Sequence, residues 1–287
     1  MKKLLLSFFI AGVVILTSCQ KEYSTENGGN GSGGAVIIGA DCRISMIAFA
    51  DSAAGFGIGS ISAIINGADN ATDITLFDSL SFTLDFNSVP QYFGDTVAID
   101  PDQYFVLDNA TKRVRLFHGF FDPTVPGSPE FDVDYVYDAS GYLINKFYSF
   151  SLLPGIPYQQ VTYTYTGGNL THMVTDDLFT GDMIKDADLT YFTNIAPKNY
   201  INLFPDEDTY SEFNQFYSFG KKSINAVKSL KIRYYDPGNV PADSASSVFG
   251  SYIMSRDNYV LNVIMTGDDQ VSIPAAEGKL SFSYKCK

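Results

Sequence analysis

Val133-Asp134-Tyr135-Val136-Tyr137-Asp138-Ala139-Ser140-Gly141-Tyr142-Leu143-Ile144-Asn145-Lys146-Phe147 is the stretch that decides the fold class. Valine and tyrosine recur at every second position before Asp138, and this period of two is typical of a β-strand with one buried face. Aspartate and glycine support a tight turn, because glycine readily adopts a positive φ and aspartate accepts hydrogen bonds from the backbone that follows it. The stretch therefore predicts an antiparallel β-hairpin.

The same pattern recurs twice further along the chain. Residues 160–174 form one such run, with a turn at Gly167–Asn169, and residues 252–263 form another. In the second run Asn258 holds the turn position that Gly141 holds in the first hairpin. Asparagine is a residue that tolerates a positive φ unusually well. We therefore expect two more hairpins of the same kind.

Composition extends this interpretation to the whole folded part. The 287 residues include 19 Tyr and 23 Phe but no Trp, and aromatic residues favour strands. Leu80–Phe86 and Leu280–Cys286 show the same alternation. We predict a mainly β fold, an antiparallel β-meander of repeated hairpins that is either a curved open sheet or barrel-like. One short helix is expected near 209–219, where Thr209 and Glu212 form a capping box.

These hairpins resemble the tyrosine-aspartate repeats of YD-repeat and related lipoproteins of the Bacteroidota. The likeness is carried by Tyr135–Phe147, Tyr163–Val174 and Tyr252–Val263. Phe219–Ser223, taken together with Gly278–Tyr284, resembles an uncharacterised Bacteroidota outer-membrane lipoprotein family. This resemblance implies an antiparallel meander and assigns no chemistry to any residue.

The first eighteen residues have the character of an export signal. Lys2 and Lys3 precede the apolar run Leu4–Leu16, which is shorter than the roughly 20 apolar residues that a membrane-spanning helix needs. Leu16-Thr17-Ser18-Cys19 resembles the lipobox of bacterial lipoproteins. This resemblance implies cleavage before Cys19 and lipid attachment to that residue. The alternative is cleavage by the ordinary signal peptidase, which leaves Cys19 as a spare thiol.

Three segments follow from these signals: a lipoprotein signal peptide at 1–18, a lipidated cysteine and Gly-rich tether at 19–34, and a single β-rich domain at 35–287. Glycine-rich tethers are flexible. Gln20-Lys21-Glu22 resembles the signal that follows the lipidated cysteine in surface-exported lipoproteins of the Bacteroidota. An outer membrane lipoprotein is expected, either on the cell surface or on the periplasmic face.

Two cysteines remain in the expected domain. Cys286 lies on the apolar face of its strand and Cys42 is in step with Ile44 and Met46, so both thiols are expected to face the core. An oxidising cell envelope allows a disulfide between Cys42 and Cys286. The alternative is two inert, buried thiols on separate strands.

Several chemistries find no support in the sequence. The formal net charge of −13 argues against nucleic acid as a partner, since phosphates must be neutralised by lysine and arginine. His118 and His172 cannot assemble a local zinc set of the Cys/His type, and the acidic clusters lack the spacing of a calcium loop. The folded part has no serine-hydrolase elbow. We therefore predict no catalytic residue, no metal site and no cofactor.

The function expected from the sequence is that of a non-enzymatic, lipid-anchored cell-envelope protein with a binding or structural role. Its partners would be the membrane, through the lipid anchor, and a protein or glycan whose identity the residues do not reveal. The alternative is a glycan-binding accessory protein of a nutrient-uptake system.

Overall fold

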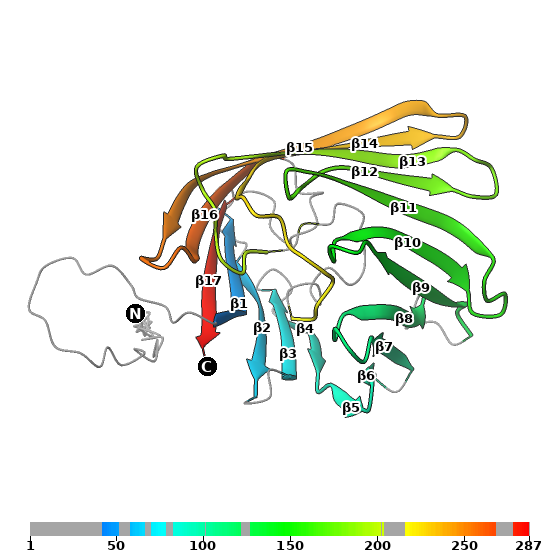
Figure 1. The fold of residues 1–287 in the computed structure, drawn as a ribbon, viewed down its shortest axis with the longest axis horizontal. Helices are drawn as coiled ribbons and strands as arrows, with labels where there is room; N and C mark the ends of the chain where they lie inside the picture. Colours follow the sequence, from blue (N-terminus) through cyan, green and yellow to red (C-terminus); the bar gives the residue numbers. More distant parts are fainter. Residues whose placement is uncertain are drawn as a thin grey trace, which may run out of the picture. The chain divides into compact units, whose positions relative to one another are not determined.

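The computed structural model describes residues 42–51, 58–66, 70–78, 83–100, 102–121, 127–201, 203, 216–267 and 278–286. All of them belong to one compact unit, Ala35–Lys287. They form a single 17-stranded antiparallel sheet (Figure 1). Its strands are β1 (Cys42–Asp51), β2 (Ile58–Ile65), β3 (Ala71–Asp78), β4 (Thr83–Ser88), β5 (Gln91–Phe93), β6 (Thr96–Asp100), β7 (Gln103–Leu107), β8 (Val114–Phe120), β9 (Glu130–Tyr137), β10 (Leu143–Phe150), β11 (Pro157–Thr166), β12 (Asn169–Asp177), β13 (Met183–Tyr191), β14 (Val227–Asp236), β15 (Val240–Met254), β16 (Val260–Gly267) and β17 (Gly278–Cys286).

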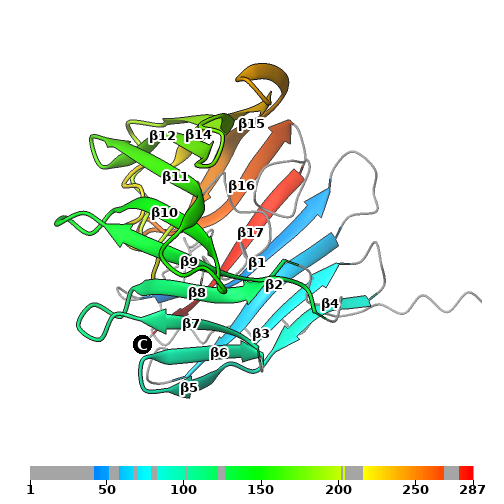
Figure 2. The same ribbon diagram turned by 90° about the vertical axis from the view of Figure 1, so that its right-hand side faces the viewer.

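The sheet curls into a nearly closed, barrel-like ring (Figures 1 and 2). Apart from β4 and β5, strands that follow one another in the chain are paired, and β17 returns to pair with β1, which also pairs with β2. β4 and β5 lie on either side of Val89 and Pro90; β4 pairs with β3, and β5 pairs with β6. The predicted antiparallel meander is confirmed, and of the two expected forms the structure shows the barrel-like one.

The three hairpins predicted from the sequence are confirmed as β9–β10, β11–β12 and β15–β16. In the first, the Asp138 side chain accepts hydrogen bonds from the backbone N–H groups of Gly141 and Tyr142, at 2.6 and 2.8 Å. Gly141 has a φ of 95° and Asn258 a φ of 65°. Both turn residues thus adopt the positive φ that the sequence pattern requires.

The helix expected near 209–219 falls mainly on residues 204–215, which lie outside the described part of the chain. Its last four residues are described, and they are not helical. Ser218 instead forms an isolated parallel bridge with Arg113. Phe216, Tyr217 and Phe219 are all buried in the core, so the described end of this stretch packs inside the ring without being helical.

Aromatic side chains and one chain segment occupy the interior of the ring. β13 and β14 are joined by a long connection, and its last described part, Phe216–Ala226, is called the inner segment below (yellow in Figure 1). The ring of Phe105 on β7 lies 5.2 Å from that of Tyr217 and 5.8 Å from that of Phe219, measured between centroids. The inner segment therefore shares the hydrophobic core with the strands.

Backbone hydrogen bonds tie the inner segment to turns at one end of the ring. Val114 donates to the Ser218 carbonyl at 2.9 Å, Lys221 donates to the Gly141 carbonyl at 2.9 Å, and Ile224 donates to the Gly168 carbonyl at 3.2 Å. Because the strands alternate in direction, this end also carries the start of β1 and the finish of β17. No helix among the described residues is long and apolar enough to cross a membrane.

Candidate ligand-binding cavity

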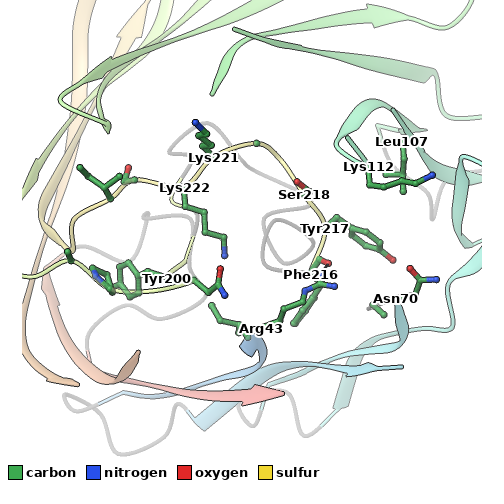
Figure 3. A pocket seen from close by; sticks show the side chains of 18 of the residues that line it. Arg43, Asn70, Leu107, Lys112, Tyr200, Phe216, Tyr217, Ser218, Lys221 and Lys222 are labelled. Atoms are coloured by element: carbon green, nitrogen blue, oxygen red, sulfur yellow. Dashed lines mark hydrogen bonds between the residues drawn. The ribbon is translucent and has the colours of Figure 1, made fainter. Parts of the chain in front are cut away.

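A cavity of about 900 Å³ lies inside the end of the ring that holds the inner segment (Figure 3). Its walls come from the start of β1, the β2–β3 turn, β5, β7 with the turn that follows it, and both described parts of the β13–β14 connection. The lining residues are Arg43, Ile44, Asn70, Ala71, Tyr92, Leu107, Lys112, Ala196, Pro197, Asn199, Tyr200, Phe216, Tyr217, Ser218, Gly220, Lys221, Lys222, Ser223 and Ile224.

The described lining of the cavity is basic. Four of its lining side chains are cationic, those of Arg43, Lys112, Lys221 and Lys222, and none of the described lining residues is acidic. Figure 3 shows Lys222 reaching into the cavity towards the side where Arg43 lies. Lys221 turns away and places its ammonium group 5.5 Å from the centroid of the Tyr142 ring. Of these two neighbouring lysines, Lys222 is therefore the one that enters the cavity.

Lys222 carries a perturbed ammonium group. The side chain is half-buried. Burial, assisted by the positive charge of Arg43, lowers the pKa of Lys222 to about 8. Both effects act against the charged form, because desolvation and a nearby like charge each raise its free energy. Lys222 is thus the cavity cation whose charge changes within an accessible pH range.

The start of β1 is held in place by several polar contacts. Arg43 donates from Nη2 to the Phe216 carbonyl at 2.6 Å, which joins β1 to the inner segment. Asn199 donates from Nδ2 to the Cys42 carbonyl at 2.6 Å, and the structure joins Cys42 to Cys286 by a disulfide. Because Cys42 directly precedes Arg43, this crosslink also positions one side of the cavity.

Tyrosines provide the neutral part of the wall. The Tyr92 hydroxyl donates to the Ala71 carbonyl at 2.7 Å, and the hydroxyls of Tyr200 and Tyr252 are 3.0 Å apart. Burial raises the pKa of Tyr92, Tyr200 and Tyr217 above the ordinary tyrosine value. These hydroxyls therefore stay protonated at the pH at which Lys222 titrates.

The free energy of unfolding is expected to rise with pH between about 8 and 10.5, the ordinary lysine value. In that window the unfolded chain binds more protons than the folded protein, because the pKa of Lys222 is lower in the folded state; below it the unfavourable charge is fully present. Arg43 faces Lys222 and keeps its charge throughout. Urea unfolding at several pH values should show that the free energy of unfolding of the parent protein rises over this range, and Lys222→Met should lack that rise. If the free energy of unfolding changed equally with pH in the two proteins, the lowered pKa of Lys222 would be contradicted.

The residues singled out in the sequence fall in different places. Cys19 lies outside the described residues, so the structure does not bear on its lipidation. Cys42 and Cys286 face each other in the β1–β17 register and are bonded. His118 lies on β8 and His172 on β12. Neither histidine lines the cavity.

His118 has a serine and an aspartate beside it, but in an arrangement unlike that of a catalytic triad. Asp132 Oδ1 lies 2.8 Å from His118 Nδ1, and Ser151 Oγ lies 3.5 Å from the same nitrogen. A triad requires the nucleophile and the carboxylate on opposite ring nitrogens. Tyr104 stacks on the imidazole, with ring centroids 4.9 Å apart. The group is a polar cluster that links β7, β8 and β9.

The acidic pair Asp186 and Asp188 is part of an ion-pair network across β12, β13 and β14. Arg233 binds Asp186 through two hydrogen bonds of 2.7 and 2.6 Å and Asp188 through one of 2.7 Å. His172 Nδ1 lies 2.8 Å from Asp188. Among the described residues, no group of three or more His, Cys, Asp or Glu is placed to hold a metal ion. These two aspartates of β13 therefore bind side chains of the neighbouring strands β12 and β14.

Sequence reasoning did not find the cavity. Two of its lining cations come from the second residue of β1 and from the inner segment, 179 positions apart in the chain (Arg43 to Lys222). The only local signal is the Lys221-Lys222 pair directly after Gly220. Nothing in that pair indicates that one ammonium group points inwards and the other does not.

No protein-family model matches the sequence, and neither does any curated protein. Among solved structures, the chain is similar to a porin-like protein from Bacteroides uniformis, with a TM-score of 0.58 and 12% identity over 84% of this chain and 98% of that one. A porin-like protein from Bacteroides vulgatus gives a TM-score of 0.54 and 12% identity, with coverage of 86% and 100%. The fold is shared with these porin-like proteins. At such low identity, the similarity extends to the fold alone.

Proposed function

We propose that this chain is a lipid-anchored outer-membrane protein that binds a ligand in the cavity of its barrel-like domain and catalyses no reaction. The observation that carries the proposal is the basic, tyrosine-walled cavity at the end of the ring where β1 begins. Pockets of roughly 300–1,000 Å³ with a few convergent polar groups are typical of small-molecule sites. The lipobox-like Leu16–Cys19 stretch and the fold shared with Bacteroides porin-like proteins support an envelope location.

The outward face of β14 supports anchoring by lipid. On β14, Val227, Leu230 and Ile232 are buried whereas Lys228 and Lys231 are exposed. Strands that span a membrane instead turn an apolar band outwards, and a lysine there is strongly unfavourable. The exposed lysines of this strand favour a domain that stands in water beside the bilayer. In this proposal the tether, 19–34, connects that domain to the lipid.

Cys19→Ala is expected to abolish incorporation of labelled palmitate and to release the protein from the membrane fraction. Without the thiol no diacylglycerol can be attached, and the lipid anchor is lost. Lys228→Gln, at an exposed position on β14, is the control and should retain both the label and the membrane association. Palmitate incorporation by Cys19→Ala, or its undiminished membrane association, would overturn the lipid-anchor part of the proposal. Protease treatment of intact cells separates the surface from the periplasmic orientation.

A second candidate is a glycan-binding accessory protein of a nutrient-uptake system, related to the lipoproteins with tyrosine-aspartate repeats. The observation that favours it is the presence of Tyr92, Tyr200 and Tyr217 in the cavity wall, since aromatic rings and hydroxyls suit sugar rings. A glycan array tests this candidate. An array without binding at high micromolar protein concentration would count against it.

A further inference from the structure

The two ends of the ring carry turns of different character. At the end that holds the inner segment, the hairpin turns at residues 108–112, 138–141 and 255–258 contain no large hydrophobic side chain. At the opposite end, the β8–β9, β10–β11 and β12–β13 connections lie together (right-hand side of Figure 1). Their described residues expose the large hydrophobic side chains that are called the apolar rim below: Phe121, Leu152, Leu153, Ile156, Leu178 and Phe179.

The apolar rim joins neighbouring turns. The Leu178 N–H donates to the Tyr158 carbonyl at 2.8 Å, which fixes the β12–β13 turn beside β11. The ring of Phe121 lies 5.7 Å from that of Phe150 and 6.1 Å from that of Tyr158, measured between centroids. The β8–β9 connection therefore packs against the strands that carry the β10–β11 turn. Adjoining exposed hydrophobic side chains of this kind mark a site for a protein or a membrane.

The shape of the apolar rim favours a membrane. Leu152 is 90% exposed and Phe179 is 66% exposed, so both side chains project from their turns. Residues 151–156 and 178–181 contain no ionisable side chain. A protein partner must match the packing density of a protein interior across the interface, whereas fluid acyl chains surround single projecting side chains without a matching surface. The rim is thus suited to the surface layer of a bilayer.

The backbone of the rim turns is suited to leaving water. In the β10–β11 turn, the Leu153 N–H donates to the Phe150 carbonyl at 2.8 Å. In the β12–β13 turn, the Asp177 side chain accepts from the backbone N–H groups of Phe179 and Thr180 at 2.7 and 3.0 Å. Backbone groups without a partner are strongly unfavourable in lipid. These turns satisfy such groups internally, next to the projecting side chains.

A membrane lies within reach of the apolar rim. The proposed lipid anchor is Cys19, and β1 starts at Cys42, at the end of the ring that holds the inner segment. The chain between these two cysteines spans at most roughly 80 Å when fully extended. A strand of ten residues such as β1 is only about 33 Å long. The anchored domain can therefore turn either end of the ring towards the bilayer.

We propose that the apolar rim inserts into the surface of the bilayer that holds the lipid anchor. This inference rests on the lipid-anchored part of the proposed function and adds a second contact with the same membrane. Zwitterionic lipid is the expected partner, because the chain has a formal net charge of −13 and the described turns of the rim contain no lysine or arginine. Anionic lipid would repel such a surface. The end that holds the cavity then points away from the bilayer.

Single tryptophans test the proposal, because the chain contains no Trp and each variant reports from one position. Leu152→Trp and Phe179→Trp place the probe on the apolar rim. Phe93→Trp is the matched control: Phe93 is 67% exposed and ends β5, next to Tyr92 in the cavity wall. The full protein is purified in detergent and reconstituted into vesicles of phosphatidylcholine and phosphatidylethanolamine, with plain or brominated acyl chains.

Bromine in the acyl chains quenches any tryptophan that contacts them. Apolar surfaces at a membrane interface reach about 5–10 Å into the boundary between headgroups and acyl chains, so we expect the two rim tryptophans to be quenched at least about fivefold more strongly than Phe93→Trp. Added salt should leave the quenching unchanged, since the contact is apolar. Replacing part of the lipid by phosphatidylglycerol, which is anionic, should reduce it.

A second substitution identifies the apolar rim as the cause. Phe179→Asp, introduced into the Leu152→Trp variant, should remove most of the quenching, because a carboxylate is unfavourable in the lipid surface. Phe93→Asp in the same variant should leave the quenching unchanged. Urea unfolding verifies that both double variants are folded, which we expect because both positions are exposed.

Three results would overturn this inference. The first is quenching of the rim tryptophans no stronger than that of Phe93→Trp. The second is a blue-shifted emission of the rim tryptophans without quenching by bromine, which would mean that the rim packs against a second copy of the chain. The third is undiminished quenching after Phe179→Asp. Palmitate labelling of the parent protein reports on the anchor alone, so failure of the rim and failure of the anchor are distinguishable.

Discussion

Replacing Cys42 by serine is expected to lower the free energy of unfolding by up to about 5 kcal/mol, the upper limit that chain entropy allows for a crosslink over so long a loop. The disulfide to Cys286 spans a sequence separation of 244 and joins the first described strand to the last. Without it, the unfolded chain regains the freedom of a loop that includes almost the whole domain. Urea unfolding of Cys42→Ser, Cys286→Ser and the double variant measures the loss.

Reduction provides the control for this prediction. Parent protein treated with dithiothreitol should unfold at the same urea concentration as the double variant, because both lack the same bond. Each single variant should match the double variant for the same reason. Mass spectrometry under non-reducing conditions gives a direct test, since free thiols at both Cys42 and Cys286 in protein isolated from the cell envelope would contradict the crosslink.

Phe105→Ala is expected to lower the free energy of unfolding by about 3–5 kcal/mol, the range for truncating a fully buried phenylalanine. Phe105 is 1% exposed. Its ring lies 5.1 Å from that of Phe117 on β8, 5.2 Å from that of Tyr217 and 5.8 Å from that of Phe219. The variant leaves a cavity between the strands and the inner segment. Urea unfolding measures the loss, and limited proteolysis should show earlier cleavage within Phe216–Ala226.

Phe93→Ala is the matched control. Phe93 belongs to the same sheet but is 67% exposed, and surface substitutions of this kind usually change stability by no more than about 0.5 kcal/mol. A loss for Phe105→Ala as small as that of the control would mean that Phe105 does not support the core. If the loss of stability were large but proteolysis unchanged, Phe105 would stabilise the core without holding the inner segment in place.

Local structure was predictable because its causes are local. Asp138 and Gly141 lie within one turn, and the hydrogen bonds that the aspartate accepts join residues three and four positions apart. The alternation of Val133, Tyr135 and Tyr137 likewise needs only neighbouring residues to indicate a strand. The helical signal near Thr209 and Glu212 is also local, but the described end of that stretch is not helical and packs in the core.

The candidate site could not be predicted, because its residues meet only through ring closure. Arg43 enters the cavity because β1 pairs with β17 at the end of the meander. Lys222 enters it because the inner segment is hydrogen-bonded to the turns at Gly141 and Gly168. These contacts join parts of the chain that are far apart in sequence, and no pattern within a window of a few residues encodes them.

The sequence by itself determined that this is an antiparallel β-meander, where its three clearest hairpins turn, and that Cys42 and Cys286 face the core. Each conclusion follows from side-chain periodicity or from the backbone preferences of single residues. Only the tertiary structure decided that the sheet is nearly closed, that the inner segment lies within it, and that Lys222 and Arg43 share a cavity. Such outcomes depend on packing between parts of the chain that are far apart in sequence, as between the rings of Phe105 and Phe219.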